Sequence, residues 1–331
     1  MSLKQQISEA FVRFNQFNIL VIGDMMIDSY MWGKVDRISP EAPVPIISIK
    51  KHEDRLGGAA NVGLNVKAMG ANPIMCALIG NDTKGGLFID LLEQNQLSTD
   101  GILKSDERTT TVKTRIISSN QHLLRIDEEE TKPLSTELEQ LFIKHIDTLF
   151  DKYQFDAIIF EDYDKGNITS IIIESVVAKA KTLNIPTLVD PKKRNFENYK
   201  GVTLFKPNFK EICEGLKTTI DKGDYIALNR AAQQLKSMLG AQYLMVTLSE
   251  LGVFVTEDDG FSHTPAEIRD IADVSGAGDT VISVASCCLA AGLPITTTAQ
   301  IANIAGGLVC EKVGVVPINK ETLFENIQHL C

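Results

Sequence analysis

The segment best suited to catalysis lies near the C-terminus and reads Asp273-Val274-Ser275-Gly276-Ala277-Gly278-Asp279-Thr280. The small residues Gly276, Ala277 and Gly278 allow backbone N–H groups to converge where the following apolar run begins a helix, and the helix dipole favours an anion there. Asp279 opens that helix, so its carboxylate can face the same space and accept a proton from an attacking hydroxyl. The pattern indicates an anion hole with a general base, as phosphoryl transfer requires. The alternative is that Asp279 only caps the helix and that the glycines form a turn.

Two polar segments near the N-terminus point to a ligand site. The first, Leu56-Gly57-Gly58-Ala59-Ala60-Asn61, precedes an expected helix; its glycines permit a ligand to approach the backbone, and the Asn61 amide offers a donor and an acceptor to hydroxyl groups. The second, Gly23-Asp24-Met25-Met26-Ile27-Asp28, puts two carboxylates just past the first expected strand, at the sheet edge where α/β proteins bind ligands. An ordinary turn explains each segment taken alone, whereas together they favour a binding site.

Composition and absent motifs exclude several classes of protein. The 331 residues include 33 Lys and Arg against 43 Asp and Glu, for a net charge of −10 without any basic run, so we expect no nucleic-acid or membrane partner. The apolar fraction of 44% is sufficient for a large core. No P-loop motif, no G-x-G-x-x-G after the first strand and no H-E-x-x-H or C-x-x-C pattern occurs, and the five histidines are scattered. These features argue against a P-loop, a dinucleotide site and a zinc site.

Features that bear on location favour the cytoplasm. The N-terminal residues MSLKQQISEAFVRF are too polar for a secretory signal, and the longest apolar stretch, 281–295, is too short to span a bilayer. Several of the six cysteines lie inside apolar runs, as expected for buried free thiols in a reducing compartment.

The elements that must position these residues alternate between short β-branched runs and helical patterns. This alternation predicts βαβ units, and hence an α/β core with a mostly parallel central sheet. Strands are expected over 18–23, 73–79, 156–160, 187–189, 203–205 and 243–248, and helices over 59–69, 85–94, 135–150, 168–184, 222–239, 276–291, 297–312 and 320–328.

Two segments break this alternation and predict a small β-lid. Residues 30–50 contain three prolines and alternate with period two, and residues 108–127 alternate Thr, Val, Ile and Leu with polar residues. Proline is not tolerated in a central parallel strand, so we expect antiparallel strands outside the main sheet. The prediction is a single domain over 1–331 with a lid built from these two insertions.

The two glycine-rich motifs resemble the signatures of the ribokinase-like (PfkB) carbohydrate kinases, in the same order and spacing and over essentially the whole chain. The resemblance implies a ribokinase-like α/β/α three-layer fold with a lid. A second set of segments is similar to those of kinases that act on D-glycero-β-D-manno-heptose 7-phosphate: Arg37-Ile38-Ser39-Pro40-Glu41-Ala42-Pro43-Val44-Pro45, Asn120-Gln121, Leu124-Arg125-Ile126-Asp127, Asp162-Tyr163 with Lys165-Gly166, and Asp190-Pro191-Lys192.

Site roles follow from the resemblance position by position. It implies that Asp279 is the catalytic base and that Gly276, Ala277 and Gly278 form the anion hole for the transferred phosphoryl group. Contacts to the sugar fall on Asp28, Gly57, Gly58, Asn61 and Asp273. Contacts to ATP fall on Asn208, Glu211, Thr247, Ser249, Gly252 and Asn303, and Asn208 and Glu211 also organise Mg²⁺, partly through water. The simpler alternatives are that Glu211 only complements a helix dipole, that Thr247 is an ordinary strand residue, and that Asn303 lies on a helix surface.

A phosphorylated acceptor requires cations, and the expected lid supplies several. Lys113 and Arg115 alternate along one strand and so share a face, which suits a phosphate clamp, and Arg125 is the third lid candidate. The alternative is a solvated lid face. The remaining candidates are Arg37, Lys165, Lys192 and Lys193.

The resemblance implies an ATP- and Mg²⁺-dependent kinase for the anomeric hydroxyl of the heptose 7-phosphate, on the route to ADP-heptose, with K⁺ dependence left open. The alternatives are a kinase for fructose 6-phosphate, ribose or another sugar, and a catalytically silent sugar-binding regulator.

The resemblance also implies lid strands that pair between protomers, and we therefore expect a homodimer. Many such kinases are fused to a C-terminal nucleotidyltransferase domain, for which the sequence, ending at Cys331, leaves no room, so we expect a separate adenylyltransferase. The sequence differs from the family pattern at Glu161 and Asp164. These two acidic residues flank Asp162-Tyr163, in a segment that is usually less acidic.

Overall fold

The computed structural model describes residues 2–119, 121–257 and 260–330. Asn120 and Cys331, which the sequence analysis used, lie outside these ranges. The main sheet is built from β1 (Asn18–Gly23), β4 (Asn72–Gly80), β5 (Ser98–Ser105), β8 (Ala157–Glu161), β9 (Thr187–Asp190), β10 (Leu204–Phe205), β11 (Tyr243–Thr247), β12 (Val253–Glu257) and β13 (Gly260–Thr264). In the described ranges its order is β13-β12-β11-β10-β9-β8-β1-β4-β5. Strands β11 to β5 run parallel, and β12 and β13 join one edge antiparallel.

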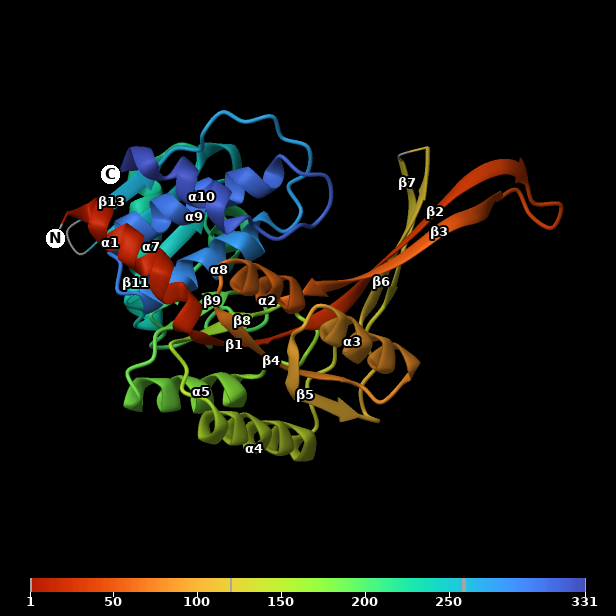
Figure 1. Ribbon diagram of the computed structural model, residues 1–331, viewed down its shortest axis with the longest axis horizontal. Helices are drawn as coiled ribbons and strands as arrows, with labels where there is room; N and C mark the ends of the chain where they lie inside the picture. Colours follow the sequence, from red (N-terminus) through yellow and green to blue (C-terminus); the bar gives the residue numbers. More distant parts are fainter. Residues whose placement is uncertain (1, 120, 258–259, 331) are drawn as a thin grey trace.

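Helices cover both faces of this sheet, as Figure 1 shows. One face packs against α1 (Leu3–Arg13), α2 (Ala59–Ala68), α3 (Thr83–Gln94), α8 (Ala277–Ala290), α9 (Ile295–Cys310) and α10 (Lys320–Asn326). The other face packs against α4 (Thr136–Lys152), α5 (Ser170–Thr182), α6 (Phe209–Gly215) and α7 (Tyr225–Leu239). Successive side chains of β1 point to opposite faces of the sheet. Val21 packs into the core on the side of α8, and Leu20 packs into the core on the side of α4. The predicted α/β/α fold is confirmed.

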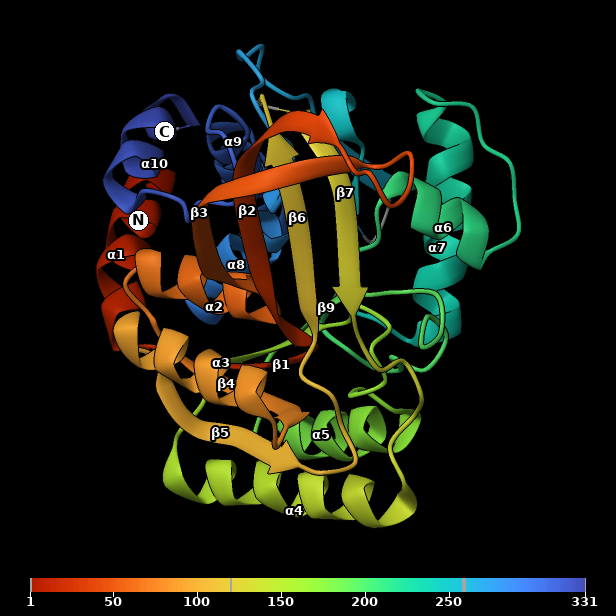
Figure 2. The ribbon, with the colours of Figure 1, turned by 90° about the vertical axis from the view of Figure 1, so that its right-hand side faces the viewer.

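A second, small sheet projects from the body and forms the lid (Figures 1 and 2). Its strands are β2 (Met25–Ile38), β3 (Pro45–Gly58), β6 (Val112–Ser118) and β7 (Gln121–Glu128), in the order β3-β2-β6-β7 within the described residues. Strands β2 and β3 pair antiparallel, as do β6 and β7, but β2 and β6 pair parallel. The expectation of purely antiparallel lid strands was therefore wrong. Strands β1 and β5 run in the same direction, and the chain continues from the carboxyl end of β1 into β2 and from that of β5 into β6. For this reason β2 and β6 pair parallel.

The lid strands also extend further towards the body than expected. Strand β2 already includes Asp28, and β3 ends with Gly57 and Gly58, so the predicted sugar contacts lie at the base of the lid. The described cysteines have free thiols; Cys213 is half-buried and the others are buried. Among the described helices, none has both the length and the apolar character needed to cross a bilayer.

Candidate active site

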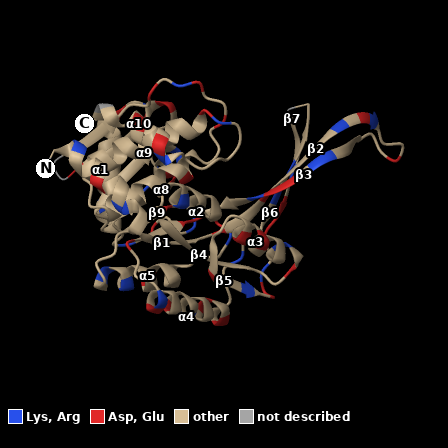
Figure 3. Ribbon diagram, in the orientation of Figure 1, with Lys and Arg blue, Asp and Glu red and all other residues tan. Residues whose placement is uncertain are grey.

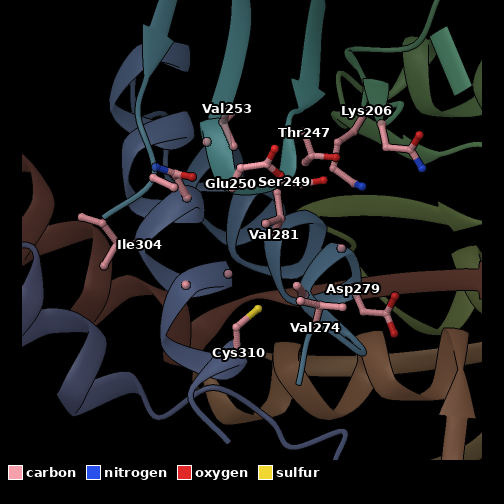
Figure 4. A pocket seen from close by; sticks show the side chains of 18 of the residues that line it. Lys206, Thr247, Ser249, Glu250, Val253, Val274, Asp279, Val281, Ile304 and Cys310 are labelled. Atoms are coloured by element: carbon pink, nitrogen blue, oxygen red, sulfur yellow. The ribbon is translucent and has the colours of Figure 1, made fainter. Parts of the chain in front are cut away.

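A cavity of about 910 Å³ lies at the carboxyl ends of the central strands, beside the N-terminus of α8 (Figure 4). In Figure 4 the side chains of Lys206, Thr247 and Ser249 lie along one side of it and Asp279 lies at the start of α8. Parallel strands end at one edge of a sheet, which is why residues from β8, β9, β10 and β11 converge here. The predicted residues that line the cavity are Lys192, Asn208, Thr247, Ser249, Gly252, Ala277, Gly278, Asp279 and Asn303.

The anion-hole segment begins α8 as the sequence indicates. Gly276 caps the helix with a φ of 79°, a left-handed conformation that favours glycine, and a Cβ there would lie 3.0 Å from Nδ2 of Asn61. Ala277 and Gly278 form the first helical positions, so their N–H groups have no partner within the helix. The backbone of Gly278 passes close to a charged pair, because an added Cβ would lie 3.5 Å from Oδ2 of Asp190. An incoming anion at this position would meet backbone donors and the positive end of the helix dipole.

The carboxylate of Asp279 is held by two donors. Nδ2 of Asn61 donates to Oδ2 at 2.7 Å, and the hydroxyl of Tyr163 donates to Oδ1 at 2.9 Å. Only 7% of Asp279 is exposed, and this burial raises the pKa of its carboxyl above the usual value. Each carboxylate oxygen retains a second lone pair, so the oriented group can still accept a proton. Asn61, expected as a sugar contact, therefore also contacts the candidate base.

Three buried carboxyl groups and one ammonium lie together beneath the anion hole. Glu161, Asp190 and Asp279 each bring an oxygen within 4.8 Å of the others, and Nζ of Lys206 lies 2.7 Å from Oδ2 of Asp190. Oε2 of Glu161 has no hydrogen-bond partner among the described atoms, and burial with the neighbouring Asp190 and Asp279 raises the pKa of Glu161 well above its usual range. Burial alone would lower the pKa of Lys206, but the charge of Asp190 outweighs it, so the side chain stays an ammonium. Lys206 is thus the counter-ion of this cluster.

Asn208 and Glu211 cap the short helix α6. The Asn208 side chain accepts from the Glu211 N–H at 2.8 Å, and Oε2 of Glu211 accepts from the Asn208 N–H at 2.8 Å. The other oxygen of Glu211 lies 2.8 Å from Nζ of Lys192, which lines the cavity. Their oxygen atoms suit a hard cation reached through water, since direct ligation would compete with these bonds. Their role with Mg²⁺ stays a prediction.

Some of the predicted acceptor residues meet at the base of the lid. Oδ1 of Asp28 pairs with Nη1 of Arg115 at 2.5 Å, and a Cβ at Gly57 would lie only 2.3 Å from Oδ2 of Asp28, so a larger residue there would displace the Asp28 carboxylate. Lys113 lies 3.0 Å from carboxylate oxygens of both Asp127 and Glu129. The lid ribbon accordingly carries charges of both signs (Figure 3). Among the described residues that line the cavity, none comes from the lid strands.

Two predicted residues make mainly local contacts. Arg125 is far more exposed than Lys113, with 59% of its side chain accessible, and it pairs with Asp127 within its own strand. Asp273 accepts from the Ser275 N–H at 2.9 Å and from the Gly314 N–H at 3.1 Å. Asp273 therefore braces the loop that leads into α8.

Comparison with known proteins gives the family. The pfkB family carbohydrate kinase profile matches residues 16–322. The chain belongs to the PfkB family. It is a sugar kinase, as predicted, and kinases of this family bind ATP, a metal ion and a sugar or sugar phosphate.

In its fold the chain is similar to phosphofructokinase-2 from Escherichia coli in complex with potassium (TM-score 0.74, 15% identity, 94% of this chain and 98% of that one). It is also similar to Arabidopsis thaliana ribokinase complexed with ribose and ATP (TM-score 0.71, 15% identity, 93% and 98%).

Curated relatives of this PfkB kinase share more of its sequence. The bifunctional protein HldE of Methylobacillus flagellatus is 41% identical over 310 residues, which is 94% of this chain and 63% of the relative. HldE of Wolinella succinogenes is 39% identical over 296 residues, or 89% of this chain and 61% of the relative. The chain thus spans less than two thirds of the length of the relatives it matches.

Several residues that the sequence analysis gave no role in this site line the cavity of the PfkB kinase. Glu161, Asp190 and Lys206 directly end or follow apolar strands, and that position was the signal that could have identified them. Tyr163 was noted only as part of a resembling segment, yet its hydroxyl contacts Asp279.

Proposed function

We propose that this PfkB kinase transfers the γ-phosphoryl group of ATP to the anomeric (O1) hydroxyl of D-glycero-β-D-manno-heptose 7-phosphate. The product would be the 1,7-bisphosphate, on the route to ADP-heptose and the lipopolysaccharide core. The observation that carries the proposal of phosphoryl transfer is the buried Asp279 carboxylate, oriented by Asn61 and Tyr163 at the N-terminus of α8. The choice of acceptor is supported by the resemblance of residues 37–45 and of the other lid segments, and by the identity to HldE proteins.

The chain's own residues account for the proposed chemistry. The acceptor oxygen attacks the γ-phosphorus while its proton passes to Asp279, the bond from the phosphorus to the bridging oxygen breaks, and ADP leaves. The N–H groups at the start of α8 hold charge on the transferred group, with the ammonium of Lys192 lining the same cavity. Asn208 and Glu211 would hold Mg²⁺ through water, and the ion would supply positive charge to neutralise the phosphates. The lid excludes water from the acceptor, and residues 1–331 act as one kinase domain.

Two alternatives are kept. The first is a kinase for another sugar or sugar phosphate, such as fructose 6-phosphate or ribose, which would use the same base and anion hole. The second is a catalytically silent sugar-binding regulator. The presence of Asp279, oriented by hydrogen bonds to both oxygens, together with Asn208 and Glu211 favours an active enzyme, because a silent protein has no chemical need to keep both a base and the residues expected to organise the metal.

The acceptor is tested by measuring ADP release with D-glycero-D-manno-heptose 7-phosphate, fructose 6-phosphate, ribose, fructose and adenosine. We expect the highest kcat/KM with the heptose phosphate and, by NMR of the product, a new phosphate on O1. The same assay in potassium and in sodium salts decides the K⁺ dependence. A higher kcat/KM with another acceptor would overturn the heptose assignment, and no turnover with any acceptor would favour the regulator.

We further propose a homodimer in which the lids of two copies cover each other. The lid exposes large apolar side chains on β2, β3 and β7 and on the turn between β2 and β3, namely Ile38, Val44, Ile49, Leu123, Leu124 and Ile126. Covering such side chains and a strand edge is favourable. Analytical ultracentrifugation at micromolar concentration is expected to show a dimer, and Leu124→Glu with Ile126→Glu to show a monomer. A monomer in the unaltered chain would contradict the proposal.

The pathway context is also part of the proposal. The chain matches only part of each HldE relative. We propose that the kinase acts in the cytoplasm and that its product is the substrate of an adenylyltransferase.

A further inference from the structure

We propose that Tyr163 is a positioning residue for Asp279: its hydroxyl orients the carboxylate and stabilises the ionised form that accepts the acceptor's proton. The inference rests on the proposed role of Asp279 as the base. Its first support is geometric, because the Tyr163 hydroxyl donates to Oδ1 at 2.9 Å while Asn61 donates to Oδ2 at 2.7 Å. Donors on both oxygens fix the plane of the carboxylate, which a single donor would leave free to rotate.

The backbone that carries Tyr163 is held in place by Asp24. This residue follows β1 and is only 1% exposed. Oδ2 of its carboxylate accepts from the Tyr163 N–H at 2.8 Å and from the Lys165 N–H at 3.0 Å, and Oδ1 accepts from the Asn167 N–H at 3.3 Å. Three bonds from one buried carboxylate fix the loop after β8, so the phenol ring reaches Asp279 from a rigid base.

The electrostatic surroundings explain why Asp279 needs this donor. Asp279 is buried, and Asp190 from β9 brings a carboxylate oxygen within 4.8 Å of it, so burial and a like charge both disfavour its ionised form. Lys206 offsets part of this repulsion by its pair with Asp190, and Lys192 lies 5.6 Å from the centre of the Tyr163 ring. Burial and these carboxylates raise the pKa of Tyr163 well above its usual value, so its hydroxyl keeps its proton throughout the range in which a kinase is assayed.

The test is Tyr163→Phe, which removes only the hydroxyl. We expect kcat to fall about tenfold to a hundredfold, the change that corresponds to losing one hydrogen bond to a charged group, with the KM values for ATP and acceptor changed less than threefold. Because the hydrogen bond favours the ionised carboxylate, the acid limb of the kcat–pH profile is expected to move to higher pH. The matched control is Tyr199→Phe, since Tyr199 donates to Oδ2 of Asp162 at 2.8 Å and does not contact Asp279. This control is expected to lower Tm but to leave the acid limb in place.

A double-variant cycle separates positioning from a structural role. If Tyr163 acts through Asp279, then Tyr163→Phe should have less than a twofold effect on kcat in the Asp279→Asn background. An equal fold-loss in both backgrounds, or an unchanged kcat in the single variant, would overturn the inference while leaving the proposed function intact. An unchanged kcat in Asp279→Asn alone would instead remove the proposed base. Tyr163→Met, which also lacks a donor, replaces Tyr163→Phe if that variant does not fold.

Discussion

Asp279→Asn is expected to lower kcat by at least ~10²–10⁴-fold, the usual contribution of a general base. The amide has nearly the same shape as the carboxylate and keeps an oxygen for a donor, but it cannot take a proton at neutral pH. ATP binding should change little, because Asp279 contacts Asn61 and Tyr163 rather than the residues expected around the nucleotide. Single-turnover measurements of phosphoryl transfer, with ATP affinity measured separately, report the two effects independently.

The control for this variant is a matched loss of one charge far from the cavity. Asp147→Asn removes a half-exposed carboxylate on α4 that pairs with Lys179 of α5, and it is expected to leave kcat unchanged. The pH profile gives a second check on the unaltered enzyme. Since burial raises the pKa of Asp279, kcat should fall as the pH drops through a midpoint above the ordinary 3.8 of an aspartate. Near-normal kcat in Asp279→Asn would remove it from the role of base.

The helix that carries Asp279 was predictable because its signal is local. Glycine with a positive φ at 276, small residues at the first helical positions and an apolar run after them specify both where α8 begins and which groups lie at its start. The same local reasoning predicted α2 after Gly57 and Gly58. The contact between these two helices, made by Asn61 and Asp279, joins residues 218 positions apart and was not predicted, because the family resemblance gave each residue its own role but did not pair them.

The carboxylate cluster could not be read from the sequence in this way. Glu161, Asp190 and Lys206 each end or follow a different strand, and they meet only because β8, β9 and β10 are neighbours in the sheet. Strand order is a tertiary property that apolar periodicity does not encode. Several elements were also missed: α1, β5, α6, β12 and β13. In β5 the pattern is weak because the strand contains Gly101 and is mostly half-buried, and α6 is only a short helix.

The lid shows the same limit. Period-two alternation correctly indicated strands around residues 30–50 and 108–127, but the parallel pairing of β2 with β6 depends on where each strand leaves the body. Which carboxylate each lid cation pairs with depends on that register. Asp28 lies opposite Lys113 in the pairing of β2 with β6, yet its carboxylate pairs with Arg115. A list of basic residues therefore could not distinguish Arg115, which pairs with a predicted sugar contact, from the exposed Arg125.

Lys206→Met is expected to have the largest effect on stability, lowering the free energy of unfolding by about 3–5 kcal/mol at pH 8, the usual loss when one member of a buried ion pair is removed. Lys206 is only 2% exposed, and its ammonium lies 2.7 Å from Oδ2 of the buried Asp190. Without it, the buried Asp190 carboxylate would keep only the partly exposed Lys192, whose Nζ lies 4.0 Å from Oδ1 of Asp190. Urea unfolding followed by circular dichroism measures the loss, and Lys210→Met is the control, because Lys210 is 81% exposed and forms only a surface pair with Glu214.

The pH dependence of this loss identifies its cause. Burial already raises the pKa of the Glu161 carboxyl well above its usual range, and the charge of Lys206 opposes that rise, so in Lys206→Met the folded-state pKa of Glu161 lies further above its unfolded value. The folded state then holds more protons than the unfolded state between those values, and stability must fall as the pH rises through that window. The loss should therefore be smaller at pH 5 than at pH 8, and Asp190→Asn added to Lys206→Met should recover part of it. A loss that is the same at both pH values would mean that packing of the lysine side chain, rather than its charge, stabilises this part of the core.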